Sequence, residues 1–244
     1  MTSTSEVRRP SEARDRLLRT ASAIFYAKGI NSVGVEEIVS EAHVTRATFY
    51  RHFPSKDDLI VAYLKARDER CRAQVHAITE HQQPAADTIR AIARWIVGQI
   101  KSPEFRGCGF LNAAAEYPDA DSRVQQAVLD HRAWFQQVMQ AELERLRGEP
   151  SEAGAQFFVM IRDGAMAAGC LAANRDAVCD AFMRGVEAML TYRPVVDPTD
   201  EESPTPAKDG GRTLRGQPAT NTESADQGTM PSSSRQHPRR ARQA

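Results

Sequence analysis

Several classes of protein are excluded by what this sequence lacks. Its four cysteines, Cys71, Cys108, Cys170 and Cys179, form no Cys-x-x-Cys pair and have no histidine at zinc-finger spacing. We therefore expect free, mostly buried thiols and no metal site. No apolar run approaches the roughly 20 residues that a membrane-spanning helix needs. The opening segment MTSTSEVRRPSEARDR has no apolar core of the kind a secretory signal requires, so we predict a cytoplasmic protein with no membrane partner.

Charge of one sign is not in excess either, because 32 Lys and Arg residues balance 32 Asp and Glu residues. Any affinity for nucleic acid must therefore come from the local placement of charge. The sequence contains neither a G-x-S-x-G nor an H-E-x-x-H motif, and we predict no enzyme, no catalytic residue and no cofactor. Glu116, Asp119 and Asp121 form an acidic group that could bind a metal, but we favour a solvated turn before a helix.

Strand-like alternation of apolar and polar residues is absent, and apolar residues instead recur every three or four positions. The predicted fold class is therefore all-α. The predicted helices cover about 11–28, 35–42, 46–52, 56–79, 89–100, 110–117, 124–147, 152–173 and 175–192. They are separated mainly by glycines and prolines, which end helices.

The segment VEEIVSEAHVTRATFYRHFPSK, residues 35–56, is the most informative part of the sequence. It indicates two short helices around a tight turn. In the second helix Arg46 and Tyr50 share one face, while Phe49 and Phe53 share another and are expected to pack inward. A helix that exposes arginine, threonine and tyrosine carries the groups that contact guanine edges and phosphates in the major groove of DNA.

The pattern I-x-x-E-A-x-V-T-R-x-T-F-Y-R-H-F-P-S-K-x-x-L, preceded by a helix, resembles the tetracycline-repressor (TetR) family of bacterial transcriptional regulators. Specific similarity covers about 14–59, and the later helices agree in number, length and order. The resemblance implies a homodimer with a three-helix DNA-binding domain and a larger helical domain that holds a ligand pocket and the dimer interface. The implied partners are a double-stranded DNA operator and a small-molecule effector.

The resemblance also implies roles for seven residues. Arg46, Thr48 and Arg51 are expected to contact base edges, and Thr45, Tyr50, His52 and Lys56 are expected to contact phosphates. Two positions depart from the family pattern.

His43 occupies the turn position where the family usually has Gly, and Gly34 replaces the usual Thr cap of the second helix. Because a residue other than Gly is disfavoured at positive φ, we expect the turn to be strained.

Four segments follow from these observations. We predict a flexible N-terminus at 1–10, a helix-turn-helix DNA-binding domain at 11–55 and a helical ligand-binding and dimerisation domain at 56–193. Residues 194–244 are rich in Pro, Ser, Thr, Gly and charge, and they hold too little apolar surface to offset ordering. This last segment is predicted to be a disordered tail.

The central helices carry more aromatic and sulfur-containing side chains than a minimal bundle needs, with a few polar groups among them. Ligand sites in helical bundles have this composition, so we predict a pocket for a small apolar or aromatic effector. The predicted ligand-binding residues are Trp95, Phe110, Asn112, Glu116, His131, Trp134, Phe135, Phe158 and Arg162.

The last two helices are predicted to form the homodimer. Their candidate surfaces are a small-residue face at 164–172 and a stripe of Val178, Phe182, Val186 and Met189, although an intramolecular core is the alternative. Two-fold symmetry predicts a pseudo-palindromic operator. Effector binding is expected to shift the fourth helix and weaken DNA binding, which makes a ligand-responsive repressor the predicted function.

Two alternatives to an effector-released repressor remain open from the sequence. The first is a DNA-binding activator, because the residues that bind DNA do not determine whether transcription is blocked or promoted. The second is a thiol redox-sensing regulator that acts through Cys108, which lies in a Gly-rich loop where we expect it to be exposed.

Overall fold

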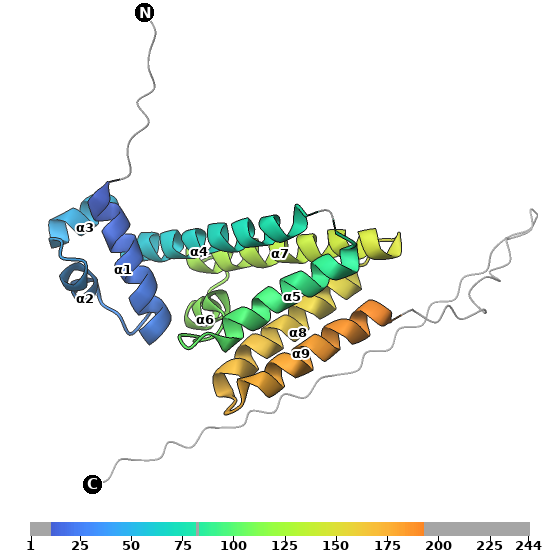
Figure 1. Cartoon of the computed structure of the whole chain (residues 1–244). Helices are drawn as coiled ribbons and strands as arrows, with labels where there is room; N and C mark the ends of the chain where they lie inside the picture. The colour runs from blue at the N-terminus through green and yellow to red at the C-terminus, as the bar shows by residue number, and fades with distance from the viewer. Residues whose placement is uncertain (1–10, 82, 193–244) are drawn as a thin grey trace, which may run out of the picture. The chain divides into compact units, whose positions relative to one another are not determined.

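The structure, a computed structural model, describes residues 11–81 and 83–192. Within these residues there are nine α-helices and no strand, which confirms the all-α prediction (Figure 1). No helix in this part of the chain is long and apolar enough to cross a membrane. The predicted flexible N-terminus at 1–10, the predicted disordered tail at 194–244 and Arg193 all lie outside the described residues.

The helices follow the predicted order along the chain. Their bounds are α1 Glu12–Lys28, α2 Val35–Glu41, α3 Arg46–His52, α4 Lys56–Thr79, α5 Ala85–Lys101, α6 Gly109–Glu116, α7 Arg123–Arg147, α8 Glu152–Leu171 and α9 Arg175–Thr191. The fifth helix begins one turn before its predicted first apolar residue, Ile89, because Pro84 can occupy a helix N-terminus without losing a hydrogen bond.

Helices α1, α2 and α3 pack around apolar residues of their own. Phe25, Ile38, Phe49 and Phe53 are each at most 3% exposed. The rings of Phe49 and Phe53 lie 6.2 Å apart, so the two aromatic residues of the recognition segment face inward as predicted. This core fixes the orientation of α3, whose other side is left for solvent.

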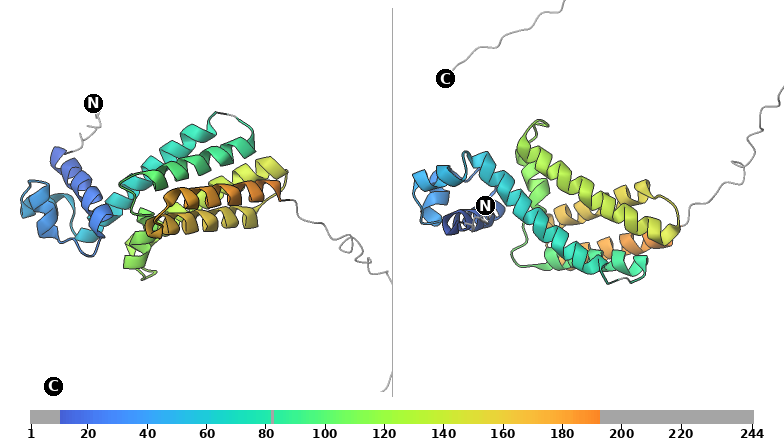
Figure 2. Two further views of the ribbon diagram at one scale, coloured as in Figure 1. Left: turned by 60° about the horizontal axis from the view of Figure 1, so that its bottom comes forward. Right: turned by 90° about the horizontal axis from the view of Figure 1, so that it is seen from above.

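Helix α4 connects this three-helix group to the later helices. It packs against α1 near its start and against α7 and α5 further along, as the views in Figures 1 and 2 agree. The buried ring of Tyr63 on α4 meets Phe25 of α1 edge to face, with centroids 5.8 Å apart. Helix α4 is therefore packed directly against α1 through buried side chains.

The remaining helices form a bundle in which α8 contacts α7 and α9, and α5 contacts α7 and α9. The short helix α6 packs beside α7. Phe182, Val186 and Met189 of α9 are at most 5% exposed and belong to this internal core. The prediction that they form a dimer stripe is therefore wrong, because α9 turns this face toward α5 and α8.

Candidate DNA-reading surface and internal cavity

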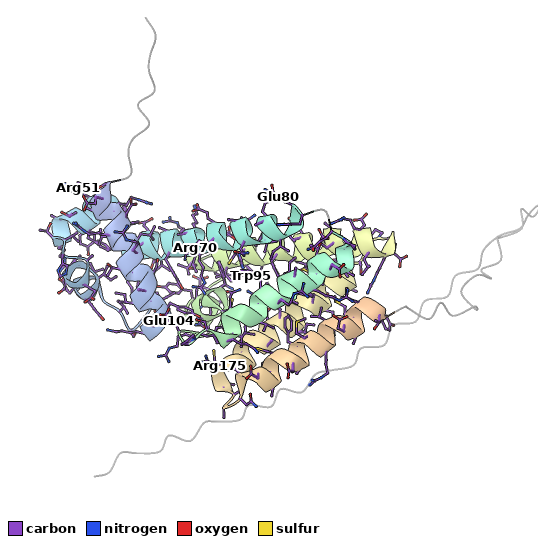
Figure 3. The ribbon with its side chains drawn as sticks, viewed as in Figure 1. Arg51, Arg70, Glu80, Trp95, Glu104 and Arg175 are labelled. Atoms are coloured by element: carbon purple, nitrogen blue, oxygen red, sulfur yellow. The ribbon has the colours of Figure 1, made fainter. Side chains whose placement is uncertain are left out.

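Helix α3 presents a polar face and begins at a side-chain cap. The Thr45 hydroxyl accepts a hydrogen bond from the backbone N–H of Thr48 at 3.1 Å and so begins the helix. Arg46 and Arg51 are exposed and Tyr50 is 41% exposed, while Phe49 between them is fully buried. Figure 3 labels Arg51 on α3. The polar face predicted from the sequence is therefore exposed at Arg46, Tyr50 and Arg51, and its contacts with DNA stay a prediction.

The exposed side chain of Arg46 contacts both α2 and its own helix. It forms an ion pair with Glu36 of α2, and its guanidinium lies 5.7 Å from the centroid of the Tyr50 ring. Both members of the ion pair are more than half exposed, and exposed pairs contribute little to stability. Arg46 can therefore exchange Glu36 for another acceptor, such as the edge of a guanine, at small cost.

The turn between α2 and α3 has the geometry that the sequence predicts. His43 adopts a φ of 51°, the left-handed region that a residue other than Gly rarely occupies. Gly34 precedes α2 without a side-chain cap. The turn keeps its shape through backbone hydrogen bonds, among them the bond from Val44 N–H to the carbonyl of Val39 at 3.0 Å.

Two of the residues predicted to contact phosphates have polar partners within the protein. The His52 ring lies 3.3 Å from the Ser11 hydroxyl, measured from Nε2 to Oγ. The Lys56 ammonium donates to the carbonyl of Ile30 at 2.7 Å, and partial burial lowers its pKa. A phosphate contact by Lys56 would require its ammonium to leave this carbonyl.

A small internal cavity lies where α4, α5, α6, α7 and α8 meet. Its volume is about 20 Å³, enough for one water molecule. It is lined by Arg67, Cys71, Trp95, Gln99, Gly107, Cys108, Phe110, His131, Phe135, Arg162 and Met166. Five of the predicted ligand-binding residues, Trp95, Phe110, His131, Phe135 and Arg162, are thus brought together, and Figure 3 labels Trp95 on α5.

The His131 ring forms one wall of the cavity and is held from two sides. It stacks on Phe110 with centroids 3.6 Å apart, and its Nδ1 lies 2.7 Å from a carboxylate oxygen of Asp68. Burial lowers the pKa of His131 to about 4, although the Asp68 carboxylate opposes this shift. The ring is therefore neutral at neutral pH, and its Nδ1–H donates to Asp68.

Arg162 brings a guanidinium to the cavity from α8. Its Nη1 donates to Asp163 at 2.7 Å, its Nη2 contacts the Cys108 sulfur at 3.4 Å, and its Nε has no partner among the described residues. The guanidinium also lies 5.4 Å from the centroid of the Phe135 ring. Such a group stays charged when buried, so it is a strong local attraction for an anion.

The other four predicted ligand-binding residues lie outside this cavity, which corrects their placement. Only Gly109, Phe110 and Ala113 of α6 are buried, so Asn112 and Glu116 of that helix point elsewhere.

Asn112 donates to the Arg106 carbonyl, and Glu116 binds the turn after α1. Trp134 lies under Arg72 in a separate groove between α4 and α7, of about 490 Å³. Phe158 is fully buried between the rings of Phe135 and Phe182.

Several cavity residues were not predicted from the sequence. Arg67 lies one helical turn after Tyr63 on α4, a spacing that places it on the same face, but nothing in the local sequence identifies that face as a cavity wall. Cys108 was expected to be exposed and is instead 5% exposed. The loop before α6 folds inward, and Gly107 makes this possible with a φ of 87° and no room for a Cβ beside the Cys170 sulfur.

The same loop is bonded to α1. The Tyr26 hydroxyl donates to the Gly107 carbonyl at 2.9 Å and accepts from the Arg106 backbone N–H at 2.9 Å. The Arg67 guanidinium lies 4.5 Å from the centroid of the Tyr26 ring. Two residues of the cavity wall, Gly107 and Arg67, therefore contact a single side chain of the helix-turn-helix unit.

A second connection joins the end of α6 to the turn that follows α1. The Glu116 carboxylate accepts hydrogen bonds from the backbone N–H groups of Ile30 at 2.9 Å and Asn31 at 2.5 Å. Because Lys56 donates to the carbonyl of Ile30, this turn is held by α6 and α4 together. The helix-turn-helix unit is thus hydrogen-bonded both to the loop before α6 and to the last residue of α6, Glu116.

Known proteins share both the N-terminal helices and the later helices of this chain. The family model described as bacterial regulatory proteins, tetR family, matches residues 17–63. SCO4454, a TetR-family transcriptional regulator from Streptomyces coelicolor, is 53% identical, with 74% of this chain and 95% of that chain covered and a TM-score of 0.72.

Two curated relatives match the N-terminal part of the sequence. The HTH-type transcriptional regulator TcmR of Streptomyces glaucescens is 29% identical over 100 residues, which are 41% of this chain and 44% of TcmR. The HTH-type transcriptional activator FasR of Mycolicibacterium smegmatis is 29% identical over 89 residues, which are 35% of this chain and 41% of FasR. The chain thus spans less than half the length of these curated relatives.

The high identity to SCO4454 extends over nearly all of that protein and includes both the helix-turn-helix and the later helices. These relatives are transcriptional regulators. This chain belongs to the TetR family of bacterial transcriptional regulators, which are DNA-binding proteins.

Proposed function

We propose that the protein is a repressor that binds a pseudo-palindromic operator as a homodimer and is released by a small apolar or aromatic effector. The observation that carries this proposal is the hydrogen-bonded link between the cavity wall and α1 through Tyr26. A cavity that only completed the core would not require a polar contact with the DNA-reading unit. The link supports communication between the two sites.

The DNA contacts follow from chemistry and exposure. Arg46, Thr48 and Arg51 are proposed to contact base edges, since a guanidinium can pair bidentately with guanine. Thr45, Tyr50, His52 and Lys56 are proposed to contact phosphates, which fix the position of the protein but carry no sequence information. The exposure of Arg46, Tyr50 and Arg51 supports this assignment most directly.

The effector is proposed to act by moving α6 and the loop before it. A ligand that enlarges the cavity displaces Gly107 and Cys108, and Tyr26 couples that displacement to α1. Helix α4 moves together with α1, because it carries Arg67 at the cavity and Lys56 at the turn after α1. A coupling of about 1–3 kcal/mol would change operator affinity roughly 5- to 150-fold, provided that the effector binds the DNA-incompatible state better.

The homodimer is proposed to form through the outward faces of α8 and α9. Helix α8 exposes an apolar and small-residue stripe at helical spacing, formed by Ala153, Phe157, Met160, Gly164, Ala167 and Leu171. Met160 is 58% exposed and Leu171 is 87% exposed, which is unusual for large apolar side chains. Helix α9 adds Ala177, Ala181 and Ala188, and small residues allow close packing of helices across a two-fold axis.

The dimer can be tested by a charge placed in this stripe. Met160→Glu is expected to give a monomer by light scattering at micromolar concentration, because a carboxylate would be buried without a partner. Leu129→Glu is the matched control, since Leu129 is similarly exposed at 43% but lies on α7. A wild-type protein that is already a monomer would contradict the proposal.

The function as a whole is tested by mapping where the protein binds in the genome. Wild type is expected to occupy few sites that share a pseudo-palindromic sequence, and Tyr50→Ala is expected to lose them. Titration of candidate ligands against a preformed operator complex then tests release. If no cellular small molecule alters operator affinity, the effector part of the proposal fails while DNA binding stands.

An activator is the second candidate, and the name of FasR as a transcriptional activator favours its consideration. The two roles differ in the effect of deleting the gene. Transcription from an occupied promoter rises on deletion if the protein is a repressor and falls if it is an activator. Reporter measurements at the mapped sites separate the two.

A further inference from the structure

The Arg162 guanidinium has one edge without a strong acceptor. Its Nη1 is satisfied by Asp163, but Nε has no partner and Nη2 donates only to the thiol sulfur of Cys108 at 3.4 Å. In a guanidinium, the Nε–H and the adjacent Nη2–H point in the same direction and together match the two oxygens of a carboxylate. The unsatisfied edge is therefore the one that a carboxylate fits.

The charges around the cavity favour an anion. Arg67 and Arg162 line it, and no Asp or Glu does. The nearest acidic partner of Arg162, Asp163, is shared with Arg132 on α7, so one carboxylate faces two guanidinium groups. His131 adds no negative charge, and Asp68 behind it is already bonded to Arg72 and to the imidazole. A buried guanidinium in these surroundings gains a charge-assisted hydrogen bond from an anionic ligand.

The walls of the cavity are aromatic. Phe110 and His131 form a parallel stack, and Phe135 and Trp95 complete the lining. A second hollow of about 20 Å³ adjoins it and shares Phe110, His131, Phe135 and Arg162 with it. Displacement of the shared Phe110 and Phe135 rings would join the two hollows beside the open edge of Arg162. Each hollow holds only about one water molecule, so a ligand must push these rings apart, and a single ring requires less displacement than a larger ligand.

We propose that the cavity binds a monocyclic aromatic carboxylate, whose two oxygens accept hydrogen bonds from Nε and Nη2 of Arg162. The ring of the ligand packs against Phe110, Phe135 and His131, and its carboxylate replaces the Cys108 thiol as the acceptor. This inference rests on the proposed function, because it names the chemical class of the effector for the same cavity.

The ligand class is tested on the unaltered full-length protein. Isothermal titration calorimetry compares benzoate with benzamide and benzyl alcohol, which keep the ring but remove the charge. Benzoate is expected to bind about 10- to 100-fold more tightly than either neutral compound, as expected for hydrogen bonds to a charged group. This comparison does not depend on whether a variant folds.

The role of Arg162 is tested with Arg162→Lys, which keeps the positive charge but removes the paired N–H donors. Benzoate binding is expected to weaken about tenfold or more. Arg94→Lys, at an exposed position beside Trp95 on α5, is the control and is expected to leave binding unchanged. Circular dichroism establishes that each variant is folded.

The outcomes separate this inference from the proposed function. Equal affinities for benzoate and benzamide would overturn the carboxylate class and leave effector control standing. No benzoate binding by wild type at about 1 mM would overturn the inference as well. Benzoate binding that depends on Arg162 but leaves operator affinity unchanged would support the ligand class and contradict effector-controlled DNA binding.

Discussion

The proposed DNA-reading surface and the internal cavity differ in how the chain assembles them. The reading surface comes from one short stretch, Thr45 to Lys56, and its polar residues lie on the outside of a helix whose inner side is Phe49 and Phe53. The cavity draws residues from five helices and depends on the inward fold of the loop that carries Gly107 and Cys108. The first is a local feature of sequence, and the second exists only in the tertiary structure.

This difference has an energetic consequence. Exposed residues of a reading helix can change with little effect on stability, because they make few contacts in the free protein. Residues that line the cavity also complete the core, so their substitution alters stability and ligand response together.

Substitutions at Phe49 and at its neighbour Tyr50 are expected to affect different properties, namely stability and DNA binding. Phe49→Ala removes a fully buried ring and is expected to lower the free energy of unfolding by about 3–5 kcal/mol. Tyr50→Ala is expected to change it by about 0.5 kcal/mol or less but to weaken operator binding. Denaturant unfolding and a DNA-binding titration measure the two quantities. Equal losses of stability in both variants would contradict the division between a buried residue that stabilises the fold and an exposed residue that binds DNA.

His131 makes the stability of the cavity region dependent on pH. Burial holds the pKa of His131 at about 4, below the unfolded value of about 6.5. The unfolded chain therefore binds this proton more readily, and the contribution of neutral His131 to stability is fully present above about pH 6.5. It is lost as the pH falls toward about 4.

The expected loss from this group between pH 7 and pH 4.5 is about 2–3 kcal/mol. His131→Phe, which keeps a ring against Phe110, is expected to remove that part of the pH dependence of the unfolding free energy. His76→Gln is the control, because His76 is an exposed histidine on α4. The Asp68, Arg72 and Arg162 side chains near His131 remain in both proteins. An unchanged pH profile in His131→Phe would mean that His131 titrates normally.

A substitution of Arg46 is expected to change DNA affinity and leave stability nearly unchanged. Arg46→Ala is expected to weaken binding to the mapped operator by about 1–3 kcal/mol and to relax the preference for one base pair. Stability is expected to change little, because the ion pair with Glu36 is exposed. Arg70→Ala, at an exposed position on α4, is the control for loss of positive charge (Figure 3). A uniform loss of affinity for all sequences would instead identify Arg46 as a phosphate contact.

The same division explains how much of the molecule could be predicted from its sequence. The helix period predicted all nine helices of the described residues, and the turn residue His43 was correctly expected to be strained. These are local properties. Of the predicted ligand-binding residues, Trp95, Phe110, His131, Phe135 and Arg162 meet at the cavity, because inward aromatic and charged residues of central helices tend to converge.

The misplaced residues show what the sequence cannot supply. Asn112 and Glu116 are polar groups in an apolar segment, and composition alone does not distinguish a residue that enters a pocket from one that binds a loop carbonyl or a turn amide. Phe182 belongs to a regular apolar stripe that fits an internal core as well as a dimer interface. Only the rotation of α9 about its axis decides between them, and that rotation is set by packing against α5 and α8.

Tyr26 is the point where the two regions meet, and it carries the smallest expected effect. Tyr26→Phe removes the hydroxyl that joins α1 to Gly107 and Arg106 but keeps the ring beneath the Arg67 guanidinium. The expected cost in stability is about 1 kcal/mol, the usual net contribution of a hydrogen bond, because the N–H of exposed Arg106 can bond to water although Gly107 is buried. The operator affinity of the free protein is expected to change little.

The change that matters is in the response to the effector. If the hydroxyl transmits movement of the cavity wall, the ratio of operator affinities without and with a saturating effector is expected to fall severalfold in Tyr26→Phe, while the effector still binds. Tyr192→Phe, an exposed phenol just beyond α9, is expected to leave this ratio unchanged. An unaltered ratio in Tyr26→Phe would leave α4 and the Glu116 contact as the route between the two regions. Because coupling is reciprocal, operator DNA must change effector affinity by the same factor, so calorimetry of effector binding with and without DNA measures the same ratio independently.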